Sequence, residues 1–279
     1  MNSLSRNSPD ARRVVLGAAV GFDISQVRTF IQSLRASGYG GDIVMLVGPL
    51  QFALKSYLSS RGVQPLPAWY IRRIHGPIFT YRFELLAQYL DRHADRYDQV
   101  LISDVRDVVF QRHPFEGITN PACHFFLESA DWTIGSEPTN MRWMQMFLAP
   151  DQIARIRDCQ ITCCGVSLGG IGGMTRYLNC MAKYLHAVPL KIRRRHGADT
   201  VFHNLMAHLT RDVDCVMIEN NGHVATMGLE PASAYVVGAD RLIRTASGGL
   251  PAILHQYDRI PEFRDAVEAR CSAEWSTEN

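Results

Sequence analysis

Two aspartates stand three residues apart, just after a short apolar run in the first half of the chain. The run Val100-Leu101-Ile102 predicts a buried strand of a parallel sheet, and Asp104 lies where that strand leaves the sheet. In an open α/β sheet, ligands bind beyond the carboxyl ends of the strands. Asp104 and Asp107 at that edge would hold a hard divalent cation, whose other ligands are water and substrate phosphate. The alternative is that Asp104 caps a turn and Asp107 faces water.

Length and composition describe an ordinary globular protein of 279 residues, 47% hydrophobic and 20% charged. The chain is long enough for one large α/β domain or two smaller ones. Its net charge of +2 is too small to indicate nucleic acid or a membrane surface as the main partner. No apolar run approaches the roughly 20 residues that span a bilayer, and residues 1–13 lack the apolar segment of a secretion signal. Seven cysteines, an odd number, argue against a complete disulfide framework, so we expect reduced thiols in the cytoplasm.

Strand and helix patterns alternate along the first half of the chain. Apolar strand patterns are separated by amphipathic helix patterns, which predicts a mainly parallel sheet with helices on its faces. The predicted strands of this half are residues 14–20, 43–47, 63–66 and 100–102, and the predicted helices are 24–34, 52–58 and 78–89. The second half is less regular, with strands predicted at 124–127 and 215–218 and helices near 141–147, 174–185 and 201–209.

A glycine-dense segment, residues 165–173, follows the apolar run at 161–164. Its local interpretation is a flexible turn between a strand and a helix. Its functional interpretation is a loop in which bare backbone, at Gly165 and Gly169, lets a sugar approach closely. The signatures G-x-G-x-x-G, G-x-x-x-x-G-K-[ST] and G-x-S-x-G are all missing, which disfavours dinucleotide-binding, P-loop and hydrolase folds.

Four features, in this order along residues 14–258, resemble the GT-A-fold glycosyltransferases. The strand–helix half that ends in the acidic motif resembles their nucleotide-sugar half, in which a D-x-D motif binds metal and nucleotide. Residues 165–173 resemble their mid-chain glycine turn, and Gly197-Ala-Asp-Thr-Val-Phe-His-Asn204 resembles their G-x-D-Q-x-x-x-N helix start. Ile253-Leu-His-Gln-Tyr-Asp258 resembles the segment that supplies a metal-binding histidine. The chain departs from the family pattern in two places. It has D-x-x-D in place of D-x-D, which leaves open which aspartate touches metal, and it has Thr200 in place of glutamine.

The resemblance implies a single GT-A-like α/β domain over residues 13–262, in which 13–110 bind nucleotide and 111–262 shape the acceptor side. Residues 1–12 would form a flexible tail, and residues 263–279 a tail or a helix. The resemblance also implies an activity. A hexose-like sugar would pass from a nucleoside-diphosphate-sugar donor, with UDP as our first choice, to a hydroxyl group of a glycan or glycolipid.

Under this resemblance, four side chains would hold the donor and its cation. Mn²⁺ or Mg²⁺ bound by Asp104, Asp107 and His255 would neutralise charge on the leaving diphosphate, and an imidazole ligand favours Mn²⁺. We place Asp107 and His255 directly on the cation, and Asp104 on the ribose or on the cation through water. Arg82 would add positive charge beside the donor. The alternative for Arg82 is a solvated or salt-bridged side chain.

Asp199 and Glu128 are the candidates for general base, if the reaction inverts the anomeric centre. Asp199 also fits the N-cap or first turn of the helix predicted over residues 201–209. Glu128 follows the strand predicted at residues 124–127, as does Asp131, which competes for the same role.

Two other classes of function stay open. A phosphatase or phosphotransferase of the haloacid-dehalogenase type also uses an aspartate at a strand end, but it calls for D-x-D-x-[TV] after the first strand. A non-catalytic sugar-binding module is the other class. Metal-dependent hydrolysis of a sugar nucleotide would separate the transferase from the binding module, and hydrolysis of a generic phosphomonoester would favour the phosphatase. We expect a cytoplasmic protein, or one peripheral at the inner membrane face, without a transmembrane segment.

Overall fold

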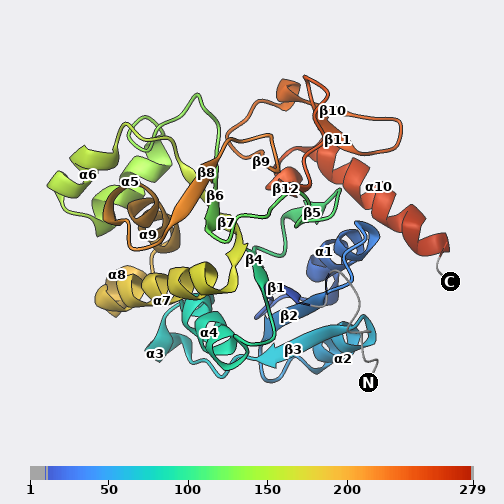
Figure 1. Ribbon diagram of the computed structural model, residues 1–279, viewed down its shortest axis with the longest axis horizontal. Helices are drawn as coiled ribbons and strands as arrows, with labels where there is room; N and C mark the ends of the chain where they lie inside the picture. Colours follow the sequence, from blue (N-terminus) through green and yellow to red (C-terminus); the bar gives the residue numbers. More distant parts are fainter. Residues whose placement is uncertain (1–9, 11, 278–279) are drawn as a thin grey trace.

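The computed structural model describes Asp10 and residues 12–277, and its centre is a seven-stranded sheet (Figure 1). In spatial order its strands are β3 (Val63–Pro67), β2 (Asp42–Val47), β1 (Arg13–Ala18), β4 (Gln99–Ser103), β7 (Thr162–Gly170), β6 (Cys123–Leu127) and β8 (Cys215–Ile218). The first four run parallel, β7 is antiparallel to both of its neighbours, and β8 is parallel to β6. The prediction of an α/β fold with a mainly parallel central sheet flanked by helices is confirmed.

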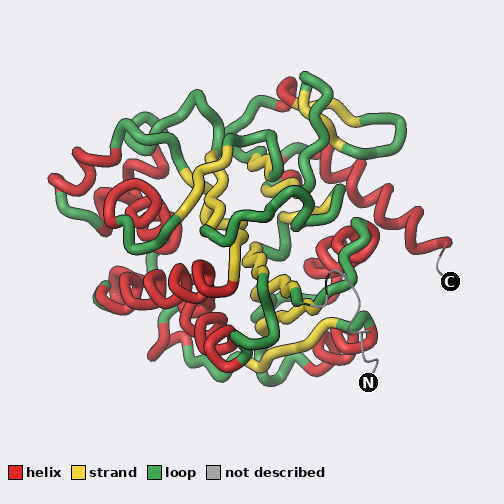
Figure 2. Tube along the Cα trace, in the orientation of Figure 1, coloured by secondary structure: helices red, strands yellow, loops and turns green. Residues whose placement is uncertain are grey.

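Helices cover both faces of the central sheet because successive side chains of its buried strands point to opposite faces and both sets are apolar. In β1, Val14 and Leu16 belong to one core and Val15 belongs to the other. The first core takes side chains from α4 (Ile78–Arg92), α7 (Ile171–Ala187) and α9 (Ala198–Leu205), and Met144, Ile153 and Ile156 join it from two outer helices. Two helices contribute to the second: α1 (Ile24–Ala36) and α2 (Phe52–Ser60). Figure 2 shows the strands enclosed between these two sets of helices.

Beside the central sheet lies a three-stranded sheet within the described residues. Its strands, in spatial order, are β5 (Val108–Phe110), β12 (Ile253–His255) and β9 (Val224–Thr226). On one face, Leu254 joins a core with Phe263 of α10 (Pro261–Thr277). On the other face, Phe110 meets Phe30 of α1 edge-on, with ring centroids 5.1 Å apart. Because β5 follows β4 after only four residues, this small sheet is held next to the carboxyl end of β4.

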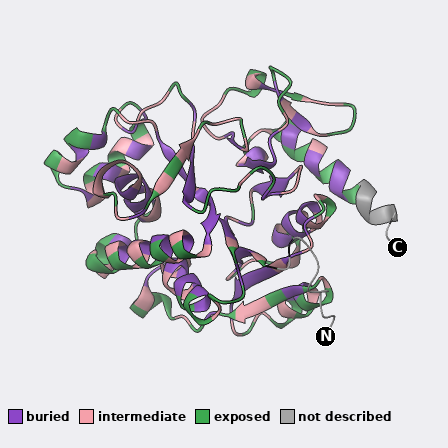
Figure 3. Cartoon of the chain, viewed as in Figure 1, coloured by how far each residue is buried: buried purple, intermediate pink, exposed green. Residues whose placement is uncertain are grey.

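The remaining elements lie around these two sheets, and Figure 3 shows that their outer faces carry most of the exposed residues. They are α3 (Arg72–His75), α5 (Pro138–Phe147), α6 (Pro150–Ile156), α8 (Leu190–Arg193), a π-helical turn (Met206–Thr210), β10 (Tyr235–Val237) and β11 (Ile243–Thr245). Among the helices of the described residues, none is both long enough and apolar enough to cross a bilayer.

The glycine-dense segment corrects one prediction. Residues 165–170 are not a flexible turn but the greater part of strand β7, and the change to helix comes only at Ile171. The glycines serve close packing between strands: a Cβ on Gly169 would lie 2.6 Å from the Ala122 carbonyl oxygen, and one on Gly170 would lie 2.8 Å from that of Pro121. Bare backbone therefore lets β7 pass beside the start of β6, where any side chain would collide with main chain.

The other predicted strands and helices are confirmed, with ends shifted by a few residues. The helix predicted over residues 201–209 is α9 followed by the π-helical turn. Most of the predicted tail, residues 1–12, lies outside the described residues. Asp10 is buried, and its carboxylate accepts hydrogen bonds from Arg13 Nη1 at 2.7 Å and from the Gly40 amide at 2.9 Å. At the other end, α10 takes up the C-terminal segment as far as Thr277.

Candidate metal centre

The two aspartates of the acidic motif lie on the connection between the two sheets. Asp104 follows the last residue of β4, and its backbone amide donates a hydrogen bond to the Gly165 carbonyl of β7 at 2.7 Å. Asp107 immediately precedes β5, and its carbonyl accepts a hydrogen bond from the Gln256 amide at 2.7 Å. The tight turn between the sheets therefore carries both carboxylates, each fixed by backbone to a different neighbouring strand.

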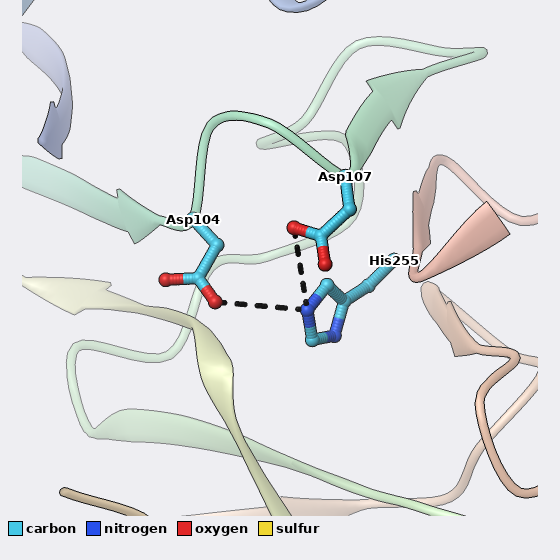
Figure 4. A group of neighbouring side chains, drawn as sticks. All are labelled: Asp104, Asp107 and His255. Atoms are coloured by element: carbon cyan, nitrogen blue, oxygen red, sulfur yellow. Dashed lines mark ion pairs between the residues drawn. The ribbon is translucent and has the colours of Figure 1, made fainter. Parts of the chain in front are cut away.

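His255 brings an imidazole to these carboxylates from the far end of the sequence. It is the last residue of β12 and pairs with Val108 of β5, directly after Asp107. Its Nε2 lies 3.8 Å from Asp104 Oδ2 and 4.0 Å from Asp107 Oδ1 (Figure 4). One ligand atom from each of the three residues lies within 4.8 Å of the other two. This spacing suits three groups that share one cation, because each ligand then lies roughly 2.1–2.5 Å from it.

The surroundings of the imidazole fit a metal ligand. His255 is buried, and its Nε2 has no hydrogen-bond partner among the described residues. Its Nδ1 lies 3.0 Å from the Cys163 sulfur. For Nε2 to bind a cation, Nδ1 must carry the ring proton and donate it toward that sulfur. Buried nitrogen atoms normally have a partner, so an unpartnered Nε2 facing two carboxylates fits a site built for a cation.

Gly165 leaves the room that this arrangement needs. A Cβ on Gly165 would lie 2.5 Å from His255 Cε1, 2.6 Å from His255 Nε2 and 3.0 Å from Asp104 Oδ2. Cys163 and Gly165 of β7 both lie against His255, Cys163 through its sulfur and Gly165 through its bare backbone. One strand thus supplies both the sulfur that faces the imidazole and the gap that receives it.

Burial and mutual contact change the proton affinity of the site. Burial raises the pKa of Asp107, and the nearby carboxylates of Asp104 and Asp258 raise it further, against the opposing effect of His255. Burial alone would lower the pKa of His255, but the contact with Cys163 and the two carboxylates outweighs it and raises that pKa to about 10. A proton on the imidazole and a cation between the three side chains are therefore competing ways to balance the same carboxylate charge.

Arg82 connects the candidate metal centre to the carboxylate of Asp199. It lies on α4, and its guanidinium forms an ion pair with Asp104 and lies 3.7 Å from Asp199 Oδ2. Burial disfavours the charged guanidinium, but Asp104 and Asp199 raise its pKa, so it stays a cation. Asp199 stands in the first turn of α9, whose N-cap is Gly197. Burial raises the pKa of Asp199, and Arg82 opposes that shift.

Glu128 approaches the centre from another side. It follows the end of β6, and its backbone amide donates to the Ile161 carbonyl at 2.8 Å. Burial raises the pKa of Glu128, and the positive charges of His255 and Arg259 oppose that shift. Asp131, its competitor in the sequence, is exposed.

A cavity of about 190 Å³ opens beside the carboxylates. Its walls come from the end of β1, the start of α4 and the acidic turn, and the lining residues are Ala18, Phe22, Ile78, Phe79, Arg82 and Asp104 to Asp107.

No model of a known protein family matches the chain, and no curated protein matches it either. The geometry of the site therefore carries the functional argument.

The structure gathers most of the residues proposed from the sequence. Asp104, Asp107, His255 and Gly165 lie in direct contact or within a few ångströms of one another. The ion pairs of Arg82 attach Asp199 to this group. Gly169 stands apart, since it packs against the start of β6.

Cys163 is the contributor that the sequence analysis did not single out. No local pattern in the sequence indicates it, because the pairing of β7 with β6 is irregular between Cys163 and Ser167.

Proposed function

We propose that the protein is a metal-dependent glycosyltransferase with a GT-A-like arrangement. A hexose-like sugar would move from a nucleoside diphosphate, with UDP as the first donor to test, to a hydroxyl group of a glycan or glycolipid. The observation that carries the proposal is the buried, unpartnered Nε2 of His255 facing the carboxylates of Asp104 and Asp107. Mn²⁺ or Mg²⁺ fits these three ligands and, when bound, would stabilise the negative charge of a departing diphosphate.

The position of the centre supports a phosphate-bearing ligand. Asp104 stands at the carboxyl end of β4, beside β1, at the edge of the sheet where α/β proteins bind their ligands. The adjoining cavity combines apolar walls at Phe22 and Ile78 with the carboxylates at its floor. A sugar nucleotide needs this combination, because its base and sugar ring are flat or apolar on their faces and its diphosphate needs a counter-charge.

Arg82 orients the centre rather than neutralising a ligand by itself. Its guanidinium is already shared between Asp104 and Asp199, so it holds one metal-binding carboxylate in place and keeps the second ionised. Asp199 is then positioned to accept a proton from an acceptor hydroxyl group, with its raised pKa favouring proton uptake. Glu128 is the second candidate for this step, and the Asp199→Asn and Glu128→Gln variants distinguish the two.

The decisive variant is Asp107→Asn, which keeps the shape of the side chain and removes its charge. We expect Mn²⁺ affinity, measured with UDP present, to fall at least tenfold and donor hydrolysis to be lost. The melting temperature of the metal-free protein should stay the same or rise slightly, because a buried carboxylate is costly when no cation is present. Thermal-shift titrations with Mn²⁺ and a panel of nucleoside diphosphates measure the melting temperature and the metal affinity. A hydrolysis assay measures the turnover of the donor.

The matched control is Asp158→Asn, since the Asp158 side chain is 93% exposed and pairs with Arg157 at the surface. It should leave Mn²⁺ affinity and hydrolysis at their wild-type values. If no nucleoside diphosphate binds with metal at millimolar concentration, the proposed function is wrong. Unchanged affinity in Asp107→Asn would instead reduce that carboxylate to a structural turn residue.

A further inference from the structure

Exposed apolar and basic side chains gather on one corner of the molecule, outside the candidate metal centre. We call the exposed side chains within residues 69–74 and 191–195 the basic apolar patch. Three large apolar members are Trp69, Ile71 and Ile74, which are 77%, 56% and 61% exposed. Solvent-facing side chains of this size, three within six residues, are unusual on a soluble surface and mark a contact region. Ile192, 36% exposed, adds a fourth.

The two segments of the patch are in contact although about 120 residues separate them. Arg194 Nη2 donates a hydrogen bond to the Arg73 carbonyl at 2.9 Å. Gly76, with a φ of 88°, ends α3, and a Cβ there would lie 3.3 Å from Leu190 Cδ1. The short helices α3 and α8 are therefore in contact; in Figure 1, α8 lies at the left end of α7 and α3 lies below it.

The charged side chains of the basic apolar patch are all positive. A carboxylate stands nearby at Glu84, which pairs with His186 and interacts electrostatically with the buried Arg193. The exposed cations are Arg72, Arg73, Lys191, Arg194 and Arg195. None of these five forms an ion pair with a carboxylate anywhere in the part of the chain that the structure describes. The sequence has no aspartate or glutamate within residues 61–83 or 184–198. The net charge of +2 for the whole chain conceals this concentration, because acidic residues elsewhere cancel it.

We propose that the basic apolar patch docks the protein on an anionic lipid surface. Trp69 and the isoleucines would enter the interface between headgroups and acyl chains, the region that tryptophan favours in membrane proteins. The five unpaired cations would lie among the lipid phosphates, where each basic residue close to the surface adds attraction. Charge complementarity supports this occupant, since the interface of an anionic bilayer offers the isoleucines an apolar partner and the arginines an anionic one.

The patch lies next to the mouth of the cavity at the metal centre. Phe79 lines that cavity, and its ring stacks on His196, directly after Arg195, with centroids 5.3 Å apart and planes 15° apart. Docking through the patch would therefore bring the cavity close to the bilayer. Together with the proposed function, on which this step rests, that position favours an acceptor carried by a lipid over a soluble glycan.

Vesicle flotation without metal or nucleotide tests the docking separately from any activity. The wild-type protein should float with vesicles of phosphatidylcholine containing 30% phosphatidylglycerol, used as an arbitrary test composition at roughly 0.1 M salt, and not with phosphatidylcholine alone. Arg72→Gln combined with Arg73→Gln should weaken binding about 25-fold, since each basic residue contributes about fivefold. Trp69→Ala should weaken it as well, and the fluorescence shift on vesicle binding should shrink in that variant.

The matched control is Arg142→Gln combined with Arg155→Gln, which removes two exposed charges from α5 and α6 outside the patch. It should float like the wild-type protein. The proposal is overturned if the wild-type protein does not bind the anionic vesicles, or if both double variants lose binding equally. It is also overturned if the protein binds a duplex RNA through the patch and does not bind the vesicles. If the protein binds the vesicles but binds no sugar nucleotide, the inference of a lipid-linked acceptor is wrong and the docking proposal stands.

Discussion

The imidazole of His255 is held on one side and open on the other, an asymmetry that fits the proposed role of a metal ligand. The Cys163 sulfur, 3.0 Å from Nδ1, is the contact that directs Nε2 toward the carboxylates. A group that orients a metal-binding histidine typically changes affinity 10- to 100-fold when it is removed. Cys163 is therefore a positioning residue whose effect can be separated from that of the ligands themselves.

We expect Cys163→Ala to weaken Mn²⁺ binding by about tenfold, because the ring loses the partner that fixes its orientation. Cys163→Ser, whose hydroxyl group can still accept a hydrogen bond from Nδ1–H, should keep most of the affinity that Cys163→Ala loses. Both variants shorten or shrink the same buried side chain. Isothermal titration with Mn²⁺ measures the affinity, and equal losses in the two variants would show that only packing is affected.

Gly165→Ala tests the space beside the imidazole. The added Cβ would lie within 2.6 Å of two ring atoms of His255, so the ring or the strand must shift. Such overpacking costs about 1–3 kcal/mol of unfolding free energy. We expect Mn²⁺ affinity to fall at least tenfold with it, measured by titration and by urea unfolding.

Gly172→Ala is the control for this substitution, because Gly172 stands in α7 with nothing within 4 Å of an added Cβ. It should raise the unfolding free energy by about 0.5–1 kcal/mol, as alanine is favoured over glycine in a helix, and leave metal binding unchanged. If Gly165→Ala keeps wild-type affinity, the ring is free to move and the site is less rigid than we describe.

The candidate metal centre depends on the single turn that joins the two sheets. Asp104 directly follows β4 of the large sheet, and Asp107 directly precedes β5 of the small one. β12 then pairs with β5 and delivers His255 to the gap between them. The sequence places the two aspartates at a strand end through a local pattern. The partner strand that brings the histidine is decided by pairing between segments about 145 residues apart, which no local pattern encodes.

Strand β7 shows why the prediction failed in the second half of the central sheet. A strand is recognised by side chains that alternate between buried and exposed, but the residues from Gly165 to Gly170 include three glycines, and both faces of β7 are buried. Its antiparallel insertion between β4 and β6 depends on how closely backbones approach, as at Gly169 and Ala122. Glycine density alone indicates a turn as readily as a close strand contact.

Asn204 links α9 to the beginning of β7 through a buried set of hydrogen bonds. Its Oδ1 accepts from the amide and the hydroxyl group of Thr162 at 2.8 and 2.9 Å, and its Nδ2 donates to the Thr162 carbonyl at 3.1 Å and the Thr200 carbonyl at 2.9 Å. The side chain thereby fixes α9, and with it Asp199, relative to the strand that carries Cys163. All four hydrogen-bonding positions of the amide are satisfied.

Asn204→Ala should therefore lower the unfolding free energy by about 3 kcal/mol, since it leaves the buried amide and carbonyl of Thr162 without partners. Urea unfolding followed by circular dichroism measures the change. The exposed Asn179 on α7 provides the control, because Asn179→Ala should stay within about 0.5 kcal/mol of wild type. A loss in Asn204→Ala no larger than in the control would mean that water replaces the lost bonds.

The structure of the first half of the chain can be predicted well from its sequence, because each buried strand there is followed by an amphipathic helix. Phe30, Ile31 and Leu34 of α1, for example, follow the helical period and all lie in one core. The small sheet could not be predicted in this way. β5, β9 and β12 are three residues long each, too short to show a period, and they are assembled from distant segments.

Buried histidines should make the stability of the whole fold depend on pH. His203 is fully buried, its ring lies 4.4 Å from that of Phe125, and its Nδ1 lies 2.9 Å from the Tyr177 hydroxyl group. Burial lowers the pKa of His203 to about 3, and burial also lowers the pKa values of His124 and His223. In the unfolded chain a histidine has a pKa of about 6.5.

The sign of the effect follows from these directions. The folded state resists protonation of His203, so its contribution to stability is complete above about pH 6.5 and is lost as the pH falls from there toward 3. Between pH 7.5 and 5.5 this one residue should lower the unfolding free energy of the metal-free protein by roughly 1 kcal/mol. His203→Gln should be less stable at pH 7.5 but lose roughly 1 kcal/mol less over the same range. Urea unfolding at pH 7.5, 6.5 and 5.5 measures both slopes, and identical slopes would show that His203 takes up its proton in the folded state.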